Sequence, residues 1–154
     1  MPKAKLAHAR GSATIFMPVD CFLDANVLVY ALSNVPTESR KKERARSLIA
    51  ASEFGISAQV LQEFYVTVTR KMKQPISPEE AREFMRTLLA FPFVPVDWQL
   101  IQRASQVSER YQISYWDGAI IAAAECLQVK TVYSEDLNAG QIYGSVRILN
   151  PFTS

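Results

Sequence analysis

The segment Cys21-Phe22-Leu23-Asp24-Ala25-Asn26-Val27-Leu28-Val29-Tyr30 constrains the fold of this chain more than any other. Its first three residues form an uninterrupted apolar run, which is typical of an inner strand in a parallel sheet. The run ends on Asp24, and the apolar residues from Val27 onward predict a helix directly after it. Open α/β sheets bind their ligands at the carboxyl ends of their strands. Asp24 is therefore predicted to lie at the ligand-binding edge of such a sheet.

The rest of the chain alternates predicted strands with predicted helices. Further strands are expected over residues 54–58, 93–96, 130–133 and 146–149. Helices are expected over residues 38–52, 59–72, 97–111 and 114–127, and from residue 78 onward, where Ser77, Pro78 and Glu80 form a helix start signal. This alternation predicts an α/β fold, a three-layer α/β/α sandwich with a mainly parallel five-stranded sheet. Pro95 favours an edge position for its strand.

Composition places the chain among ordinary globular proteins. The sequence has 154 residues, of which 49% are hydrophobic and 21% charged, which suits one domain with a substantial core. Residues 19–154 are expected to form that single domain, and residues 1–18 a disordered tail. No apolar run approaches the ~20 residues that a membrane span needs, so we expect a cytoplasmic protein with no membrane partner.

Few residues are available for histidine or thiol chemistry. Cys21 and Cys126 both lie in apolar runs, so we expect them to be small core residues in a reducing compartment. The only histidine, His8, lies in the predicted tail. Most histidine-based catalysis is therefore excluded.

Three further acids are expected at the same sheet edge as Asp24. Asp136 follows the strand at 130–133, Glu63 lies in the helix after the strand at 54–58, and Asp117 lies in the first turn of a buried helix. Clustered carboxylates repel one another unless a cation neutralises them, and hard oxygen ligands select Mg²⁺ or Mn²⁺. The four positions together predict a divalent metal site.

Each acid also has a purely structural explanation. Asp24 or Asn26 can cap the helix that follows, and Ser114-x-x-Asp117 reads as a capping box. Glu63 can be a solvated helix residue, and Asp136 a turn residue. The metal hypothesis therefore depends on the coincidence of all four positions.

The charge balance becomes informative about the substrate if the four acids share one pocket. The remaining surface then carries 17 basic against 11 acidic residues, which suits a polyanionic substrate that must meet a metal. The helix at 38–52 is rich in basic residues, among them Arg40, Lys41 and Arg44. These can contact a nucleic acid or a partner protein, or they can form an ordinary solvated face.

At these acids the sequence resembles the PIN-domain family, and within it the VapC-type toxins of bacterial toxin–antitoxin pairs. The resemblance begins near residue 20 and extends to the C-terminus. It is carried by Phe22-Leu23-Asp24-Ala25-Asn26-Val27-Leu28-Val29-Tyr30-Ala31, Ser57-Ala58-Gln59-Val60-Leu61-Gln62-Glu63-Phe64-Tyr65, Tyr115-Trp116-Asp117, Tyr133-Ser134-Glu135-Asp136-Leu137 and Asn150-Pro151-Phe152. One departure is Gly118, where a bulkier residue is more usual after the acid.

The resemblance implies a PIN fold and a metal-dependent endoribonuclease that hydrolyses RNA phosphodiester bonds. It implies that Asp24, Asp117 and Asp136 hold Mg²⁺ or Mn²⁺, and that Glu63 orients a water or acts as general base. Asn26 and Ser134 match supporting positions beside these acids. A cognate antitoxin that covers the pocket and a homodimer are implied in the same way.

Two other functions are compatible with the residues. One is a catalytically silent PIN-like module that binds RNA or serves as a scaffold. The other is a Mg²⁺-dependent phosphohydrolase with Asp24 as nucleophile. The second fits less well, because Asn26 stands where such phosphatases of the haloacid dehalogenase type require another aspartate.

Overall fold

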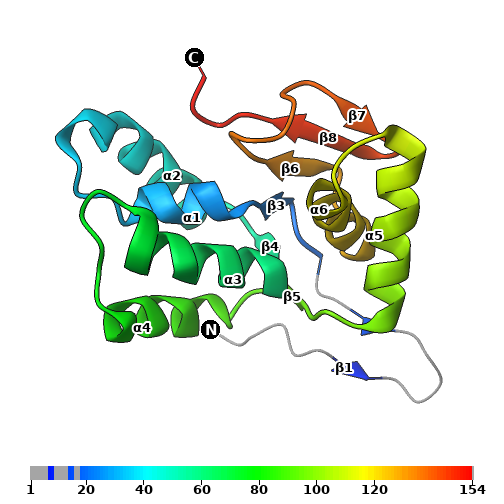
Figure 1. The fold of residues 1–154 in the computed structure, drawn as a ribbon, viewed down its shortest axis with the longest axis horizontal. Coiled ribbons are helices and arrows are strands. Elements are labelled where there is room, and N and C mark those ends of the chain that lie inside the picture. The colour runs from blue at the N-terminus through cyan, green and yellow to red at the C-terminus, as the bar shows by residue number, and fades with distance from the viewer. Residues whose placement is uncertain (1–6, 9–13, 16–17, 154) are drawn as a thin grey trace.

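The computed structural model describes residues 7–8, 14–15 and 18–153 (Figure 1). Within the predicted tail, the strands β1 (Ala7–His8) and β2 (Thr14–Ile15) pair in antiparallel fashion. Most of the tail lies outside the described residues, so its predicted disorder stays a prediction.

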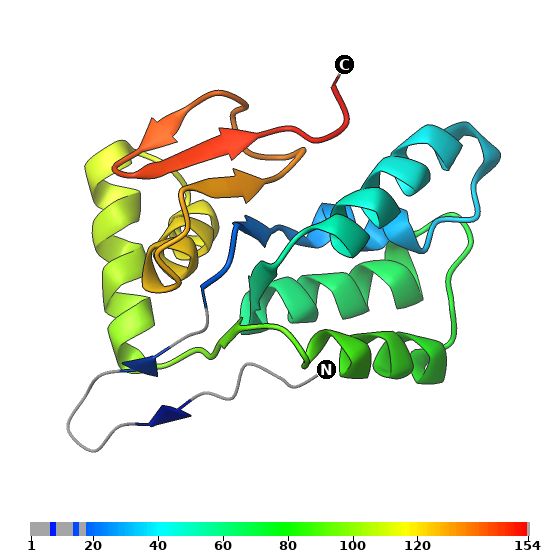
Figure 2. The same cartoon turned by 180° about the vertical axis from the view of Figure 1, so that it is seen from behind.

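A six-stranded sheet forms the centre of the domain, in the order β5-β4-β3-β6-β8-β7. Five strands are parallel, and β7 pairs with β8 in antiparallel fashion. Figure 2 shows β6, β8 and β7 side by side from behind. The strands are β3 (Cys21–Leu23), β4 (Phe54–Ser57), β5 (Phe93–Val94), β6 (Thr131–Tyr133), β7 (Ile142–Tyr143) and β8 (Val146–Leu149).

The predicted mainly parallel α/β sheet is confirmed, and it has one strand more than expected. The extra strand, β7, has only two residues and offers no periodic pattern to detect. The predicted edge position of the strand before Pro95 is confirmed, since β5 is the first strand in the sheet order.

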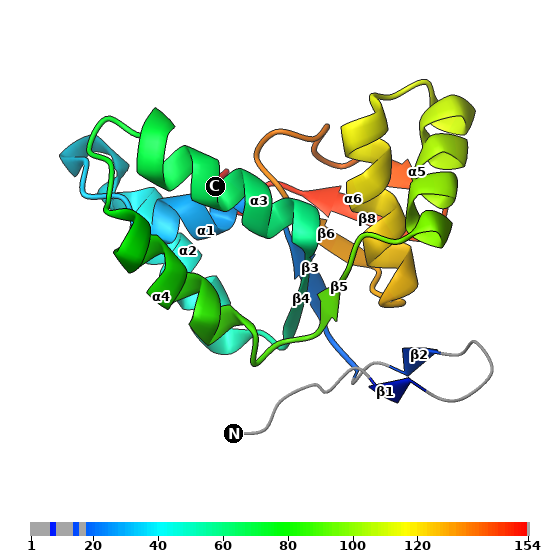
Figure 3. The same cartoon turned by 60° about the horizontal axis from the view of Figure 1, so that its bottom comes forward.

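Helices cover the central strands from two sides. In Figures 1 and 3, α5 and α6 lie together on one side of β3 and β4, and α1 to α4 lie on the other. The helical segments are α1 (Ala25–Ala31), the 3-10 turn η1 (Pro36–Glu38), α2 (Ser39–Ala51), α3 (Ala58–Val66), the π-helical η2 (Thr67–Lys71), α4 (Pro78–Leu88), α5 (Trp98–Tyr111) and α6 (Tyr115–Cys126).

Capping side chains define where most helices begin. The predicted capping box at α4 is present: the Ser77 hydroxyl accepts from the Glu80 amide, and the Glu80 carboxylate accepts from the Ser77 amide. Ser57, Asp97 and Ser114 cap α3, α5 and α6 in the same way through one bond each. Each satisfies an amide that the first helical turn leaves without a partner.

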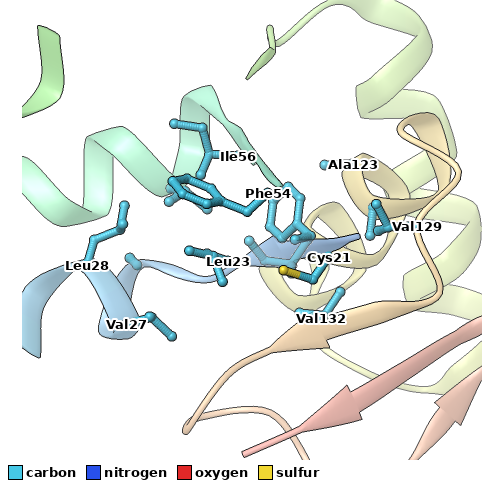
Figure 4. Packing of buried hydrophobic residues seen from close by; sticks show 14 of the residues in the cluster. Cys21, Leu23, Val27, Leu28, Phe54, Ile56, Ala123, Val129 and Val132 are labelled. Carbon is cyan, nitrogen blue, oxygen red and sulfur yellow. The ribbon is translucent and has the colours of Figure 1, made fainter. Parts of the chain in front are cut away.

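The core lies against both faces of the central strand. Phe22 and Leu23 of β3 are fully buried, as are Phe54 and Ile56 of β4. Figure 4 shows the labelled side chains from β3, β4, β6, α1 and α6 gathered around this strand. Because β3 is covered on both faces, its position is fixed, and so is the position of Asp24, which directly follows it.

The prediction of two core cysteines is correct only for Cys21. Both thiols are free, but Cys126 is exposed. It is the last residue of α6 and lies beyond the buried run from Gly118 to Ala124.

Within the described part of the chain, no helix is both long enough and apolar enough to cross a bilayer.

Candidate active site

Asp24 occupies the junction between β3 and α1 and is only 6% exposed. Its Oδ1 accepts a hydrogen bond from the Ala25 amide at 2.7 Å, so it caps α1. Its Oδ2 accepts from the Ser134 hydroxyl at 2.6 Å and more weakly from the Asn26 amide group at 3.4 Å. The capping explanation is therefore correct for Asp24, yet it uses only one of the two carboxylate oxygens.

The surroundings of Asp24 disfavour its charge. The pKa of Asp24 is raised to about 6, chiefly by burial, and the nearby carboxylates of Glu63 and Asp136 contribute to the increase. Hydrogen bonds from Ser134 and Ala25 oppose this shift in pKa. A cation beside Asp24 would reverse the effect, because it would stabilise all three negative charges.

Ser134 and Asn26 connect the end of β6 to the end of β3. The fully buried Ser134 hydroxyl accepts from the amides of Asp136 and Leu137 at 3.1 and 3.2 Å. The Asn26 side chain donates to Asp136 Oδ2 at 3.1 Å and to Ser134 Oγ at 3.3 Å. Its own Oδ1 accepts from the Glu135 amide at 3.2 Å. This network fixes Asp136 beside Asp24.

Glu63 is connected to the first turn of α6, which carries Asp117, through Gln59. The Gln59 side chain donates to Glu63 Oε1 at 3.0 Å and to the Trp116 carbonyl at 3.1 Å. Sequence reasoning missed Gln59, although it lies four residues before Glu63 and therefore on the same helix face. It joins α3 to the first turn of α6.

Asp117 forms only half of the predicted capping box. Its amide donates to the Ser114 hydroxyl at 3.0 Å. Among the described residues, no donor forms a hydrogen bond with the Asp117 carboxylate. Capping therefore explains Ser114 and leaves the half-buried Asp117 side chain without a structural role.

The structure brings Asp24, Glu63 and Asp136 to one region, and Gln59 connects Glu63 to the turn of α6 that carries Asp117, but no ready-made ligand cage results within the described residues. Asp24 and Asp136 share a hydrogen-bond network, and Glu63 is near enough to affect the charge of Asp24. Within the described residues, no three histidine, cysteine or acidic side chains lie close enough to share one ion. The donors nevertheless fit Mg²⁺ or Mn²⁺, because Mg²⁺ is usually held by one or two carboxylates and keeps several waters.

Two of the three basic residues predicted to bind RNA have partners within the protein. Lys41 pairs with Glu135 and donates to the Tyr30 hydroxyl at 3.1 Å. Arg44 donates to the Pro151 carbonyl at 3.0 Å. Arg40 is exposed, and the part of the chain that is described offers it no hydrogen bond. The RNA-binding role of these residues stays a prediction.

A pocket of about 350 Å³ opens beside Asp136 and Glu63. Its lining includes Asn26 and the apolar side chains of Val29 and Met72. Lys71 and Lys73, which follow Glu63 on the same chain segment, also line it. The acids therefore adjoin a space large enough for a small ligand, within the range of about 300–1,000 Å³ that is usual for ligand sites.

Solved structures of similar fold include several toxins. VapC20 of Mycobacterium tuberculosis, described as a sarcin–ricin loop cleaving toxin, is 17% identical with a TM-score of 0.62, over 76% of this chain and 90% of that one. A toxin–antitoxin complex from Klebsiella pneumoniae is 15% identical with a TM-score of 0.63, over 86% and 98%. DNA-bound VapBC from Salmonella typhimurium is 18% identical with a TM-score of 0.57, over 84% and 96%.

These structures share the fold of this chain. A search among curated proteins finds no match. The family model of the PIN domain matches residues 21–144, a span that includes Asp24, Glu63, Asp117 and Asp136. The chain belongs to the PIN-domain family.

Proposed function

We propose that this protein is a Mg²⁺- or Mn²⁺-dependent endoribonuclease of the VapC type, the toxin of a toxin–antitoxin pair. The observation that carries the proposal is the network in which Ser134 and Asn26 hold Asp24 and Asp136 together at the carboxyl edge of the sheet. Membership of the PIN family and the fold shared with VapC toxins support it.

Each residue receives a role in this proposal. Asp24 Oδ2, Asp136 and Asp117 would hold the ion. When bound, such an ion neutralises the phosphate and lowers the pKa of a coordinated water. Glu63, held by Gln59, would accept a proton from the attacking water or orient it. Ser134 and Asn26 would keep the first and last acids in place.

The proposal also includes partners. Two of the structural neighbours are toxin–antitoxin assemblies, which supports a cognate antitoxin for this chain as well. The substrate is RNA, and homodimer formation is proposed from the family resemblance. We propose a cytoplasmic location, because the RNA substrates of such a toxin are found there.

Cleavage of a mixed RNA pool tests the proposal. Purified protein is incubated with Mn²⁺, Mg²⁺ or EDTA, beside the variants Asp24→Asn and Asp20→Asn. Asp20 is an exposed acid just before β3, so Asp20→Asn makes the same chemical change outside the site. We expect cleavage that requires metal, is abolished by Asp24→Asn and is retained by Asp20→Asn. Cleavage in EDTA, or by Asp24→Asn, would refute the proposal.

A silent RNA-binding module is the second candidate. It is favoured by one observation, the lack of a three-acid ligand group within the described residues. A thermal-shift titration with Mn²⁺ separates the two functions. A nuclease site that binds metal stabilises the fold, by about 2.7 kcal/mol at 100 times the Kd, and Asp24→Asn removes the effect. The silent module predicts no shift for either protein.

A further inference from the structure

The helix that carries Glu63 does not continue as a regular α-helix. After α3 ends at Val66, the segment Thr67–Lys71 is π-helical, and the Met72 amide donates to the Thr67 carbonyl, five residues earlier, at 3.0 Å. Such turns are rare and occur frequently at functional sites. The wider turn shifts the register by about one residue, so it changes which side chains follow the face that carries Glu63. Thr67, Lys71 and Met72 all line the pocket beside the acids.

The two pocket lysines form no ion pair within the described residues. The only ion pairs within the described ranges are Lys41–Glu135 and Arg103–Glu125. Two other acids line the pocket, but Glu38 accepts a hydrogen bond from Ser33 and Glu135 pairs with Lys41. Lys71 and Lys73 are exposed and therefore available to an anion.

The position of Lys71 relative to Glu63 suits a substrate that is longer than one phosphate. Lys71 is eight residues after Glu63 along one helical segment, which corresponds to about 12 Å at α-helical rise and somewhat less because part of the segment is π-helical. A nucleotide or two of an extended strand spans such a distance. The same pocket is lined by the apolar side chains of Val29 and Met72 and by Tyr30.

Tyr30 is held in place by its neighbours. Its ring contacts Phe152 edge-on, with centroids 4.9 Å apart, and its hydroxyl accepts from Lys41. Aromatic side chains bind single-stranded nucleic acid by stacking on bases, with little sequence preference. Lys41 lies 4.6 Å from the centroid of the same ring, so the Tyr30 ring is fixed, and it lines the pocket together with the acids and the two lysines. Such a ring is a suitable surface for contact with a base or its sugar.

We propose that this pocket is a nucleotide subsite, in which Lys71 and Lys73 bind a phosphate one or two nucleotides from the scissile bond and the wall around Tyr30 contacts the base between. The inference rests on the proposed nuclease function. The proposed subsite adds to the four acids a binding element that comes from the π-helical segment.

The first test compares Lys71→Ala/Lys73→Ala with Arg70→Ala/Lys130→Ala. The control pair removes the same charge. Arg70 lies in the same π-helical segment, and Lys130 lies just before β6, at the amino ends of the strands. Neither residue lines the pocket. On a defined cleaved RNA, we expect the lysine pair to raise KM about tenfold with a smaller change in kcat, since it removes binding common to substrate and transition state. Equal losses in the two pairs would overturn the subsite, because they would show only an effect of net charge.

The second test measures binding without cleavage. In EDTA and in an Asp117→Asn background, binding of uncut RNA should show a salt slope that is smaller by about 0.7 after loss of both lysines, which is the value for one phosphate contact on a single strand. RNAs with one neutral methylphosphonate at successive positions locate the contact. Neutralising one position near the cut site should weaken binding by the parent protein and leave binding by the lysine variant unchanged.

The two hypotheses fail in different ways. If the parent protein cleaves with metal but the lysine pair matches the control and the methylphosphonate scan is flat, the nuclease stands and the subsite is wrong. If no metal-dependent cleavage occurs yet the scan finds the lysine-dependent phosphate, the subsite stands as an RNA-binding site and the nuclease proposal is wrong.

Discussion

The negative charge that metal binding requires on Asp24 is unfavourable for the metal-free fold. A buried carboxylate that lies near Glu63 and Asp136 is unfavourable in the absence of a cation, and its pKa is raised to about 6 for that reason. Its hydrogen bonds with Ser134 and Ala25 compensate in part. The folded, metal-free protein therefore holds a proton at Asp24 more tightly than the unfolded chain does.

This difference gives a pH dependence with a definite sign. The folded pKa lies above the unfolded value of about 3.9, so the associated stability is present below pH 4 and is lost as pH rises through 6. In EDTA, the unfolding free energy of wild type minus that of Asp24→Asn should fall by up to about 3 kcal/mol between pH 4 and 7. Denaturant titration at several pH values measures it. A constant difference would show that Asp24 titrates normally.

Ser134 is the hydroxyl on which the network depends. Ser134→Ala removes the donor to Asp24 and leaves the Asp136 and Leu137 amides without their acceptor. We expect a loss of about 2–3 kcal/mol in unfolding free energy, since buried polar groups lose their partners, together with loss of cleavage. Ser105→Ala, at an exposed position on α5, is the control and should change stability by less than about 0.5 kcal/mol. Wild-type cleavage by Ser134→Ala would contradict the supporting role.

The sequence could indicate where Asp24 and Ser134 lie, because each directly follows a predicted strand of the sheet. It could not show the Asn26–Asp136 or Gln59–Trp116 hydrogen bonds. These depend on the angle at which separate elements meet, which no local pattern encodes.

Among the elements, α5 and α6 pack unusually closely, and Gly118 is the reason. A methyl group at Gly118 would lie 2.7 Å from the Ala104 carbonyl oxygen and 3.0 Å from the Ser108 nitrogen, both backbone atoms. The bulkier residue that is more usual at this position would therefore separate the helices. Because Gly118 has no side chain, the N-terminal turn of α6, which carries Asp117, lies directly against α5.

Gly118→Ala should therefore destabilise the protein although alanine favours helices. The propensity gain is about 1 kcal/mol, whereas overpacking against backbone costs typically 1–3 kcal/mol. We expect a net loss of about 1 kcal/mol in unfolding free energy and a several-fold lower kcat, because Asp117 moves with its helix. Gln102→Ala, exposed on α5, serves as control. A stabilised, fully active Gly118→Ala would refute the close-packing argument.

The π-helical turn marks the limit of element prediction. Apolar spacing predicts a helix over residues 59–72, and helical structure does extend from Ala58 to Lys71. No glycine or proline announces the change of geometry after Val66. The signal is absent because the turn depends on packing, with Val68 fully buried inside it.

For the whole molecule, some of the basic charge on α2 serves the architecture. Arg44 and Lys41 face the C-terminal residues: Arg44 bonds to Pro151, and Lys41 lies 4.6 Å above the Tyr30 ring and 5.6 Å above that of Phe152. Net charge, which the sequence gives directly, cannot distinguish such internal contacts from charge that is available to a polyanion.

Arg40 and Arg44 form a matched pair for this question. Arg44→Ala should lower the unfolding free energy by about 1–2 kcal/mol, since it leaves the Pro151 carbonyl without its charged donor. Arg40→Ala should change it by less than about 0.5 kcal/mol. Thermal or denaturant unfolding measures both, and equal destabilisation would contradict the proposed tether. RNA affinity measured on the same two proteins separates a substrate contact from a structural one.

The strand order could not be read from the sequence either. Periodicity identifies five strands, but β3 lies between β4 and β6, and β6 begins more than 100 residues after β3 ends. Such long-range pairing is decided by packing of the complete chain.

The same pairing has a consequence for translation. The Asp24–Ser134 hydrogen bond joins residues 110 positions apart, so the first acid acquires this partner only after Ser134 has emerged from the ribosome. Chains grow at about 5–20 residues per second and fold largely in that order. For a nuclease that attacks RNA, late assembly means that a nascent chain spares the message and the ribosome that are producing it until most of its length has been synthesised.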